Sequence, residues 1–314
     1  MASWLSTLSR CAPDAKVRAL VKTCVILNPN AGRAKKIEQL VEKFRQRGLT
    51  DVRVTRRRAA AEKFAERAVA SGCERIIAAG GDGTLNEIVN GIARSARKAS
   101  IGIIPLGTGN DFARVLGLPN DIDAAIEVAR TGRRKPVDLV RVTSDRVRYF
   151  VNVSAGGFSG LVDEKLTPKI KRTWGPLAYL RGAAAAAPGL RAYETTIKFG
   201  RVKFSRSLYN VIIGNGRYVA GGIPIAPTAK LSDGLLDIIL IPELPATEIA
   251  LLVAQIVMGK HLSNKSIIFR RAKKVTVKSS PGMWFNVDGE LVGNQPAVFE
   301  IMPRAIHFMV GRNS

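Results

Sequence analysis

Three glycine-rich segments contain the residue types best suited to binding a phosphate. They are Asn28-Pro29-Asn30-Ala31-Gly32, Gly80-Gly81-Asp82-Gly83-Thr84 and residues 105–114, which include Thr108 and Asp111. Glycine allows backbone N–H groups to come close to a phosphate, and a following helix N-terminus favours negative charge. Asp82 lies among glycines, where a carboxylate is costly to bury unless it meets a cation or hydrogen-bond donors. Together the segments predict a site for a phosphorylated ligand and a cation.

Each segment has a plainer explanation when it is taken alone. Residues 80–84 suit a tight turn, Asn-Pro-Asn is a common turn, and Asp111 stands where a helix N-cap is expected. The second segment is not a Walker loop, because no Gly-Lys-Ser or Gly-Lys-Thr follows it, and it lacks a predictive G-x-G-x-x-G form. Three such segments after three predicted strands are stronger evidence than any one of them.

The elements around these segments alternate between strands and helices. This alternation indicates an α/β domain with an open, mostly parallel sheet and glycine-rich loops. Because ligands bind at the carboxyl ends of the strands in such sheets, we expect the three segments to converge on one site. The predicted strands are residues 22–27, 51–55, 75–79 and 101–105, and the predicted helices are residues 37–44, 62–71 and 85–93.

Beyond residue 140 the pattern changes to short β-like runs separated by glycine, proline or charge. We predict a mostly β, sandwich-like domain here. The predicted division is an N-terminal extension at 1–20, a nucleotide-binding α/β domain at 21–142 and a lipid-substrate domain at 143–314, whose last strand is free to return to the first domain. The β-like runs are 149–154, 195–199, 209–213, 236–241, 275–278 and 298–301, with helices expected at 177–187 and 246–258.

Composition narrows the classes of partner and compartment. The formal net charge is +24, which attracts polyanions such as nucleic acid or an anionic membrane surface. Three scattered cysteines give neither a disulfide framework nor a zinc site, and only two histidines are present, so a general base is expected to be a carboxylate. The longest apolar stretch, 249–258, is half of the roughly 20 residues that a spanning helix needs, and residues 1–20 lack the apolar region of a signal peptide. We expect a cytoplasmic protein that visits the membrane peripherally.

The motifs, in their order and spacing, resemble those of diacylglycerol-kinase-like lipid kinases. Residues 28–32, 80–87 and 105–114 resemble the nucleotide-binding domain of that family, and the resemblance extends over residues 21–311. Gly156-Gly157-Phe158 and residues 214–217 are most similar to its bacterial YegS-like branch, whereas residues 158–161 follow the wider pattern only loosely. Matching positions in the second half are Gly214-Asn215-Gly216-Arg217, Gly221-Gly222, Ala226-Pro227, Asp233-Gly234-Leu235-Leu236-Asp237 and Asp288-Gly289-Glu290.

The resemblance implies a set of site residues. Glu290 would accept a proton and, with Asp82, carry the catalysis, while Asp82, Asp111 and Asp138 would form an acidic network around Mg²⁺. A second, structural metal, Mg²⁺ or Ca²⁺, would take the carboxylate of Asp233 and the backbone carbonyls of Lys230 and Leu235. The positions implied for ATP are Asn28, Pro29, Asn30, Ala31, Gly32, Thr55, Gly80, Gly81, Asp82, Gly83, Thr84, Leu85, Asn86 and Thr108.

The implied reaction is transfer of the γ-phosphate of ATP to a hydroxyl of a membrane lipid such as diacylglycerol or phosphatidylglycerol, a step of phospholipid metabolism. Phosphoryl transfer needs positioning and charge neutralisation, with a carboxylate to accept the hydroxyl proton. From local sequence alone, Asp288-Gly289 before Glu290 also suits a simple hairpin, and so does Asp233-Gly234. Two other functions are an NAD-kinase-like small-molecule kinase, which shares the Asp82 loop, and a non-catalytic nucleotide- or lipid-binding regulator.

Basic residues cluster at 53–58, 165–172 and 260–278. Each Lys or Arg near an anionic leaflet contributes about 1 kcal/mol of attraction, and Trp174 and Tyr179 beside the second cluster suit an interfacial contact. We therefore predict peripheral contact with an anionic lipid surface. Nucleic acid is not a predicted partner, because no RNA-binding signature is present and aromatic residues make up only 6% of the chain. The sequence leaves the oligomeric state open, a homodimer included.

Overall fold

The computed structural model describes residues 21–34, 36–157 and 190–312. The extension 1–20, the basic cluster at 165–172 with Trp174 and Tyr179, and the helix expected at 177–187 lie outside the described residues.

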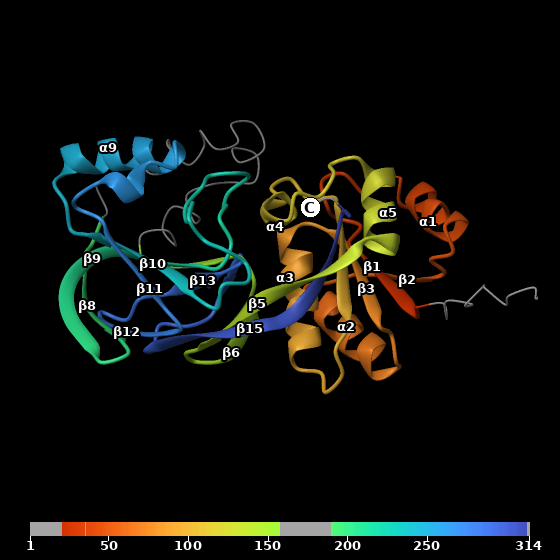
Figure 1. Cartoon of the computed structure of the whole chain (residues 1–314), viewed down its shortest axis with the longest axis horizontal. Coiled ribbons are helices and arrows are strands. Elements are labelled where there is room, and N and C mark those ends of the chain that lie inside the picture. Colours follow the sequence, from red (N-terminus) through yellow and green to blue (C-terminus); the bar gives the residue numbers. More distant parts are fainter. Residues whose placement is uncertain (1–20, 35, 158–189, 313–314) are drawn as a thin grey trace, which may run out of the picture.

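The N-terminal half is a parallel sheet with helices between its strands (Figure 1). Strands β2, β1, β3 and β4 are neighbours in that order, and every pair is parallel. The predicted α/β architecture is confirmed, with one further helix, α5, which begins where the side chain of Asp121 accepts the N–H of Ala124. The elements are β1 (Thr23–Leu27), α1 (Ile37–Gln46), β2 (Asp51–Val54), α2 (Ala60–Ala70), β3 (Arg75–Gly80), α3 (Asp82–Ala93), β4 (Ser100–Pro105), α4 (Asp111–Val115) and α5 (Ile122–Thr131).

The second half is mostly β, as predicted. The run expected as one strand at 149–154 is two strands, β6 and β7, because the N–H groups of Val151 and Val153 donate to the carboxylate of Asp288. The elements are β5 (Arg133–Thr143), β6 (Val147–Phe150), β7 (Val153–Gly157), β8 (Tyr193–Phe199), β9 (Val202–Gly214), β10 (Leu236–Pro242), α9 (Ala246–Val257), a 3-10 turn (His261–Ser263), β11 (Ile268–Ala272), β12 (Lys274–Ser280), β13 (Phe285–Val287), β14 (Glu290–Leu291) and β15 (Ala297–Val310).

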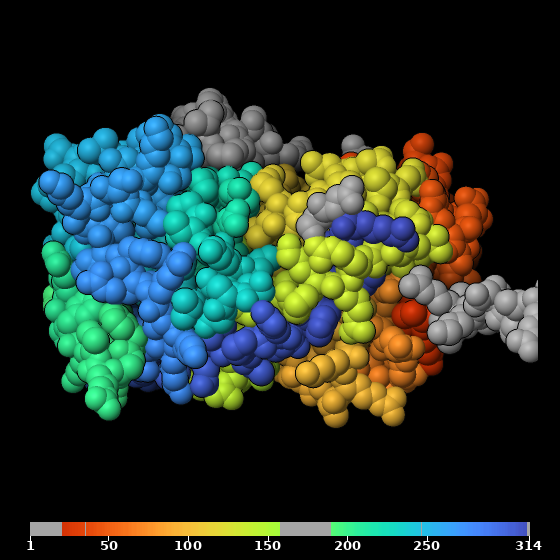
Figure 2. Space-filling view, in the orientation of Figure 1, coloured from red at the N-terminus to blue at the C-terminus, as the bar shows by residue number. Residues whose placement is uncertain are grey.

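Strands β5 and β15 connect the two halves. They pair antiparallel along most of their length, and the register shifts between Met302 and Ile306. On one side of that shift β15 pairs with β12, and on the other side it runs parallel to β4 in the N-terminal sheet. Figure 2 shows the dark blue end of the chain passing from the β-rich half onto the N-terminal half. The division after residue 142 stays a prediction, because hydrogen-bonded strands cross it.

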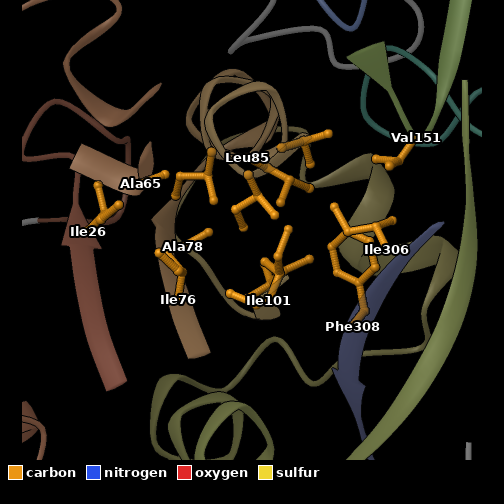
Figure 3. Close-up of a cluster of buried hydrophobic side chains, with 14 of the residues drawn as sticks. Ile26, Ala65, Ile76, Ala78, Leu85, Ile101, Val151, Ile306 and Phe308 are labelled. Carbon is orange, nitrogen blue, oxygen red and sulfur yellow. The ribbon is translucent and has the colours of Figure 1, made fainter. Parts of the chain in front are cut away.

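A buried apolar cluster fixes helices α2 and α3 against the parallel sheet (Figure 3). Ile76 and Ile101 come from the sheet, Leu85 from α3, and Phe308 from β15, and each is at most 4% exposed. Burying side chains of this size contributes about 1.5 to 3 kcal/mol each. The helices also approach closely, since a Cβ added at Gly91 would lie 2.4 Å from the carbonyl oxygen of Glu62. The packing therefore sets where α3 begins at the sheet edge.

Candidate active site

The three glycine-rich segments meet around one cleft at the carboxyl edge of the parallel sheet. Its volume is about 470 Å³. Nine of the positions expected to contact ATP line it, from all three segments and the end of β2. The lining residues are Asn28, Asn30, Ala31, Gly32, Thr55, Arg57, Arg58, Ala61, Gly81, Gly83, Thr84, Glu87, Gly107 and Thr108.

Close packing of the second and third segments requires glycine. A Cβ added at Gly107 would lie 2.5 Å from the Cα of Gly81, and one added at Gly81 would lie 3.1 Å from the Cα of Gly107. The N–H of Leu106 donates to the carbonyl of Gly80 at 2.9 Å, and the N–H of Gly107 donates to the Asn110 side chain at 2.9 Å. Any side chain at these glycines would separate the loops and open the floor of the cleft.

Helix α3 points its N-terminus at the cleft. It begins at Asp82, directly after Gly81, so the unpaired N–H groups of its first turn lie at the edge where a phosphate would bind. Asn28 joins the first and second segments by donating from Nδ2 to the Thr84 Oγ1 at 3.0 Å. One turn further along α3, the Glu87 carboxylate accepts the N–H groups of Ala59 and Ala61 at 3.0 Å each. Glu87 thereby caps α2, whose start has no side-chain cap of its own.

The other expected ATP positions do not line the cleft. The side chain of Leu85 is 4% exposed and belongs to the core, and Asn86 is 5% exposed with its Nδ2 3.5 Å from the carbonyl of Val287. Pro29, Gly80 and Asp82 are not among the lining residues either. Their expected contacts with ATP stay a prediction.

Several lining residues were missing from the sequence-based set. They are Arg57, Arg58, Ala61, Glu87 and Gly107. Arg57 and Arg58 follow the end of β2, and a basic run at the carboxyl end of a parallel strand was the signal that could have placed them in the site.

Two carboxylates converge beside the cleft. A Cβ added at Gly109 would lie 3.2 Å from the Oδ2 of Asp82 and 3.4 Å from the Oδ2 of Asp111. Asp82 accepts the N–H of Phe112 at 3.2 Å, and Asp111 accepts the N–H of Gly221 at 2.9 Å. The structure thus brings together these two expected magnesium residues.

Burial raises the pKa of Asp111 to about 6, and the negative charge of Asp82 raises it as well. The Gly221 N–H acts in the opposite direction, and so does Arg114, whose guanidinium pairs with Asp111 at 2.9 Å. Because the charge of Asp82 disfavours ionisation of Asp111, a divalent cation bound beside these two carboxylates would be stabilised.

A third carboxylate, Asp288, adds to this acidic edge. Asp288 and Gly289 form the two-residue turn between β13 and β14, and their φ angles are positive, at 45° and 91°. Burial raises the pKa of Asp288 to about 7, the N–H groups of Val153 and Val151 lower it, and the charge of Asp82 raises it. The hairpin reading of Asp288-Gly289 is therefore confirmed, and the turn brings a further acid toward Asp82. Sequence analysis had not assigned Asp288 to the site.

Glu290 follows that turn and pairs with two arginines. Its Oε1 lies 2.9 Å from Arg148 and 2.8 Å from Arg146. Arg148 also pairs with Glu62 of α2 at 3.2 Å, and its side chain is 12% exposed. The ring of Phe285 packs against that of Phe299 at 5.1 Å between centroids, which anchors the hairpin in the β-rich core. Glu290 is thus held at the junction of α2, β6 and β14.

Asp138 has a different environment from the one expected of it. It is 0% exposed, and its carboxylate accepts the N–H groups of Gly234 and Arg304 at 2.7 Å each. Arg304 lies in the β15 register shift with φ of 51°. Asp138 therefore joins β5 to β15 and to the loop before β10, and its place in a magnesium network stays a prediction.

The expected structural-metal residues share that loop. Asp233 is exposed, and one of its carboxylate oxygens accepts the N–H of Leu235 at 3.1 Å. Asp233-Gly234 is not a hairpin turn between paired strands, because β9 ends at Gly214 and β10 begins only at Leu236. Lys230 and Leu235 lie in the same loop as Asp233, so the three expected ligand positions are close in sequence.

The acidic edge offers Mg²⁺ two carboxylates as ligands, those of Asp82 and Asp111. No group of three or more potential ligands gathers into a metal-binding arrangement within residues 21–34, 36–157 and 190–312. Mg²⁺ at phosphate sites commonly takes only one or two carboxylates and completes its shell with water and phosphate oxygens. The paired carboxylates of Asp82 and Asp111 suit that mode.

Comparisons with known proteins agree for both halves of the chain. Residues 22–142 match the diacylglycerol kinase catalytic domain, and residues 152–310 match the YegS C-terminal NAD kinase beta sandwich-like domain. A diacylglycerol kinase of Bacillus subtilis (strain 168) is 33% identical over 291 residues, which are 91% of this chain and 95% of that one. The chain therefore belongs to the diacylglycerol-kinase-like family of lipid kinases, and it is a kinase.

Solved structures show the same fold. The crystal structure of a Bacillus anthracis (strain Sterne) protein assigned as a diacylglycerol kinase has a TM-score of 0.81 at 26% identity, covering 96% of this chain and 98% of that one. An NAD kinase from Archaeoglobus fulgidus in complex with ATP has a TM-score of 0.53 at 13% identity, covering 91% and 93%, and this likeness concerns the fold alone.

Proposed function

We propose that this kinase transfers the γ-phosphate of ATP to a hydroxyl of a membrane lipid, with diacylglycerol as the first acceptor to test. The observation that carries the proposal is the position of the glycine-lined cleft beside Asp82, Asp111 and the Glu290 hairpin. Phosphoryl transfer depends mainly on positioning and electrostatic stabilisation. The cleft supplies backbone donors, and the adjoining edge supplies carboxylates for a cation and for a proton.

The phosphates of ATP are assigned to the N-terminus of α3 and the facing loops. Gly81, Gly83 and Thr84 come from the second segment, and Thr108 from the third, so both walls of the cleft contribute. Asp82 and Asp111 would hold Mg²⁺, which would supply positive charge to neutralise the phosphates. Asn28, through its hydrogen bond to Thr84, keeps the first segment closed over the same phosphates.

Glu290 is the proposed proton acceptor for the lipid hydroxyl. Its ion pairs with Arg146 and Arg148 fix the direction of the carboxylate. Arg148 also pairs with Glu62, which anchors it to α2. A base must be within hydrogen-bond reach of the proton that it removes, so orientation comes before basicity. Arg148 is accordingly proposed as a positioning residue for Glu290.

A second metal, Mg²⁺ or Ca²⁺, is proposed for the loop that contains Lys230, Asp233 and Leu235. The support is the donor chemistry: one exposed carboxylate and backbone carbonyls in one loop are hard oxygen ligands. Asp138 holds the same loop through the Gly234 N–H at 2.7 Å, so the loop has a rigid base. A metal there would fasten the junction between the two halves.

The protein is proposed to work at the cytoplasmic surface of an anionic membrane. No helix in the described part of the chain is long and apolar enough to cross a bilayer. The net charge of +24 supports contact with anionic headgroups, screened beyond about 10 Å at ordinary salt.

A panel of acceptors with labelled ATP tests the proposal. Diacylglycerol, phosphatidylglycerol, a sphingoid base and NAD are each offered with Mg²⁺ to the purified protein, and the products are separated by thin-layer chromatography. We expect label in one or more phosphorylated lipids. Label in NADP alone would favour the NAD-kinase-like alternative, and no label with any acceptor would favour a non-catalytic binding protein.

A further inference from the structure

A second hollow lies beside the nucleotide cleft, between strand β2 and helix α2 (both labelled in Figure 1). Strand β2 is the outermost strand of the parallel sheet on this side, so the hollow opens at the sheet edge. Its volume is about 630 Å³. Four of its seven lining residues are cationic and none is acidic; the lining is Val54, Arg56, Arg57, Ala60, Lys63, Phe64 and Arg67.

The four cations have no anionic partner within the described part of the chain. Arg56, Arg57, Lys63 and Arg67 are all exposed, and their side chains take part in no ion pair or hydrogen bond there. Positive charges gathered around one hollow repel each other, and a bound anion relieves that repulsion.

The neighbouring acids do not neutralise this cluster. Asp51 of β2 pairs with Arg53 at 2.9 Å, and Glu62 of α2 pairs with Arg94 and Arg148. Glu66 is exposed on α2 but does not line the hollow. Asp51 and Glu62 are thus paired with other arginines, and no acidic residue lines the hollow.

The remaining lining residues are apolar. Ala60 is buried, whereas Val54 and Phe64 are partly exposed within the hollow. A small inorganic anion would leave this apolar surface in contact with water. A ligand that carries a phosphate and an adjoining hydrocarbon portion would use both kinds of surface, because covering the apolar area removes it from water.

We propose that the hollow between β2 and α2 binds the phosphate-bearing headgroup of an anionic phospholipid. The phosphate meets the cations, and the glycerol and first methylene groups lie on Val54 and Phe64. Arg57 lines both this hollow and the nucleotide cleft, so a bound headgroup brings the cleft to the membrane surface. The inference deepens the proposed function by choosing the face that meets the lipid, and its test does not depend on kinase activity.

Flotation of the full-length protein with vesicles tests the site. Binding is measured on phosphatidylcholine vesicles with and without phosphatidic acid, in the presence of a non-hydrolysable ATP analogue that fills the nucleotide cleft. The double variant Lys63→Gln/Arg67→Gln is expected to bind the anionic vesicles about tenfold more weakly than the wild type. A charge-preserving variant, Lys63→Arg/Arg67→Lys, is expected to bind like the wild type, which shows that the loss is not caused by misfolding.

The matched control is Lys198→Gln/Lys203→Gln. These two exposed lysines pair across the β8–β9 hairpin, in the other half of the molecule, and the variant removes the same net charge. It is expected to bind within about twofold of the wild type. An equal loss in both double variants would overturn the proposal, because net charge alone would then explain membrane binding.

Competition with a soluble anion separates a lipid headgroup from free phosphate. Inorganic phosphate is added at the same phosphate concentration as the vesicles present, with ionic strength held constant. We expect no displacement from vesicles containing phosphatidic acid. Displacement in proportion to concentration would overturn the assignment to a lipid and identify a site for a soluble phosphate. A protein that phosphorylates no lipid but still shows the flotation difference would contradict the proposed function and leave this site standing.

Discussion

The pair Asp82 and Asp111 at the acidic edge and the single acid Asp138 at the junction are built from the same side chain in different environments. Asp138 is fully buried, yet backbone N–H groups at 2.7 Å satisfy both of its oxygens. Asp111 is 6% exposed, and burial together with the charge of Asp82 raises its pKa to about 6. A buried carboxylate surrounded by donors is stable without a ligand, whereas carboxylates that face each other favour a cation. The difference predicts a structural role for Asp138 and a cation-binding role for Asp82 and Asp111.

The largest expected effect is on catalysis at the acidic edge. Asp82→Asn removes the charge that faces both Asp111 and Asp288, and we expect lipid phosphorylation to fall about 100- to 1,000-fold because phosphate charge is no longer neutralised. The measurement is the initial rate with labelled ATP, alongside a thermal melt to show that the variant folds. Asp123→Asn, at an exposed ion pair with Lys43, makes the same chemical change and should retain full activity. If Asp82→Asn retained more than about a third of the wild-type rate, we would conclude that the acidic edge takes no part in the reaction.

The next effect concerns stability at the junction. Asp138→Ala leaves the N–H groups of Gly234 and Arg304 buried without an acceptor, so we expect the free energy of unfolding to fall by about 3 to 5 kcal/mol. Urea denaturation in the absence of Mg²⁺ measures it. In the folded variant, the Mg²⁺ concentration for half-maximal activity should match the wild type. If Asp138→Ala lost little stability but needed much more Mg²⁺ for half-maximal activity, Asp138 would belong to the magnesium network. The two regions would then not differ in role.

A third effect is a pH dependence that only the acidic edge should show. A carboxylate whose folded pKa is raised binds its proton more tightly in the folded state, so its contribution to stability is present at low pH and is lost as pH rises. For Asp111 this loss of stability occurs between pH 3.8 and about 6, and for Asp288 it occurs between pH 3.8 and about 7. We expect the metal-free protein to lose up to about 3 kcal/mol over this range through Asp111.

The measurement is urea denaturation with a chelator from pH 4 to pH 7.5, for wild type and Asp111→Asn. Charge repulsion elsewhere affects both proteins, so the difference between the two curves isolates the carboxylate. Mg²⁺ should restore the lost stability of the wild type more at pH 7.5 than at pH 4. Parallel curves for the two proteins would show that Asp111 carries no such strain.

The smallest effect tests the convergence of Asp82 and Asp111 itself. Gly109→Ala places a methyl group 3.2 Å from one carboxylate oxygen and 3.4 Å from the other, which pushes the two acids apart by a few tenths of an ångström. We expect about a threefold rise in the Mg²⁺ concentration for half-maximal activity, since ideal geometry matters for this ion. The free energy of unfolding should change by less than about 1 kcal/mol. A loss of stability with unchanged Mg²⁺ dependence would contradict a metal role for this edge.

Sequence patterns predicted most of the parallel half because local signals there agree. Apolar runs that end in glycine or Asn-Pro-Asn mark β1, β3 and β4, and the rule that ligands bind at the carboxyl edge of such sheets predicted the convergence of the three loops. The β-rich half was predicted in outline only. The run at 149–154 has the pattern of one strand, and its division into β6 and β7 depends on Asp288, more than 130 residues further along the chain.

The sequence by itself determined the family and the parallel strands with their glycine-rich loops, because loop glycines and strand patterns are short-range features. Only the tertiary structure decided what each acid contacts. Asp138 meets Gly234 and Arg304, and Glu290 is held by Arg148. Burial, together with the nearby charge of Asp82, raises the pKa of Asp288. Hydrogen bonding and charge interactions depend on distances between atoms that the chain brings together only when β5 and β15 close the fold.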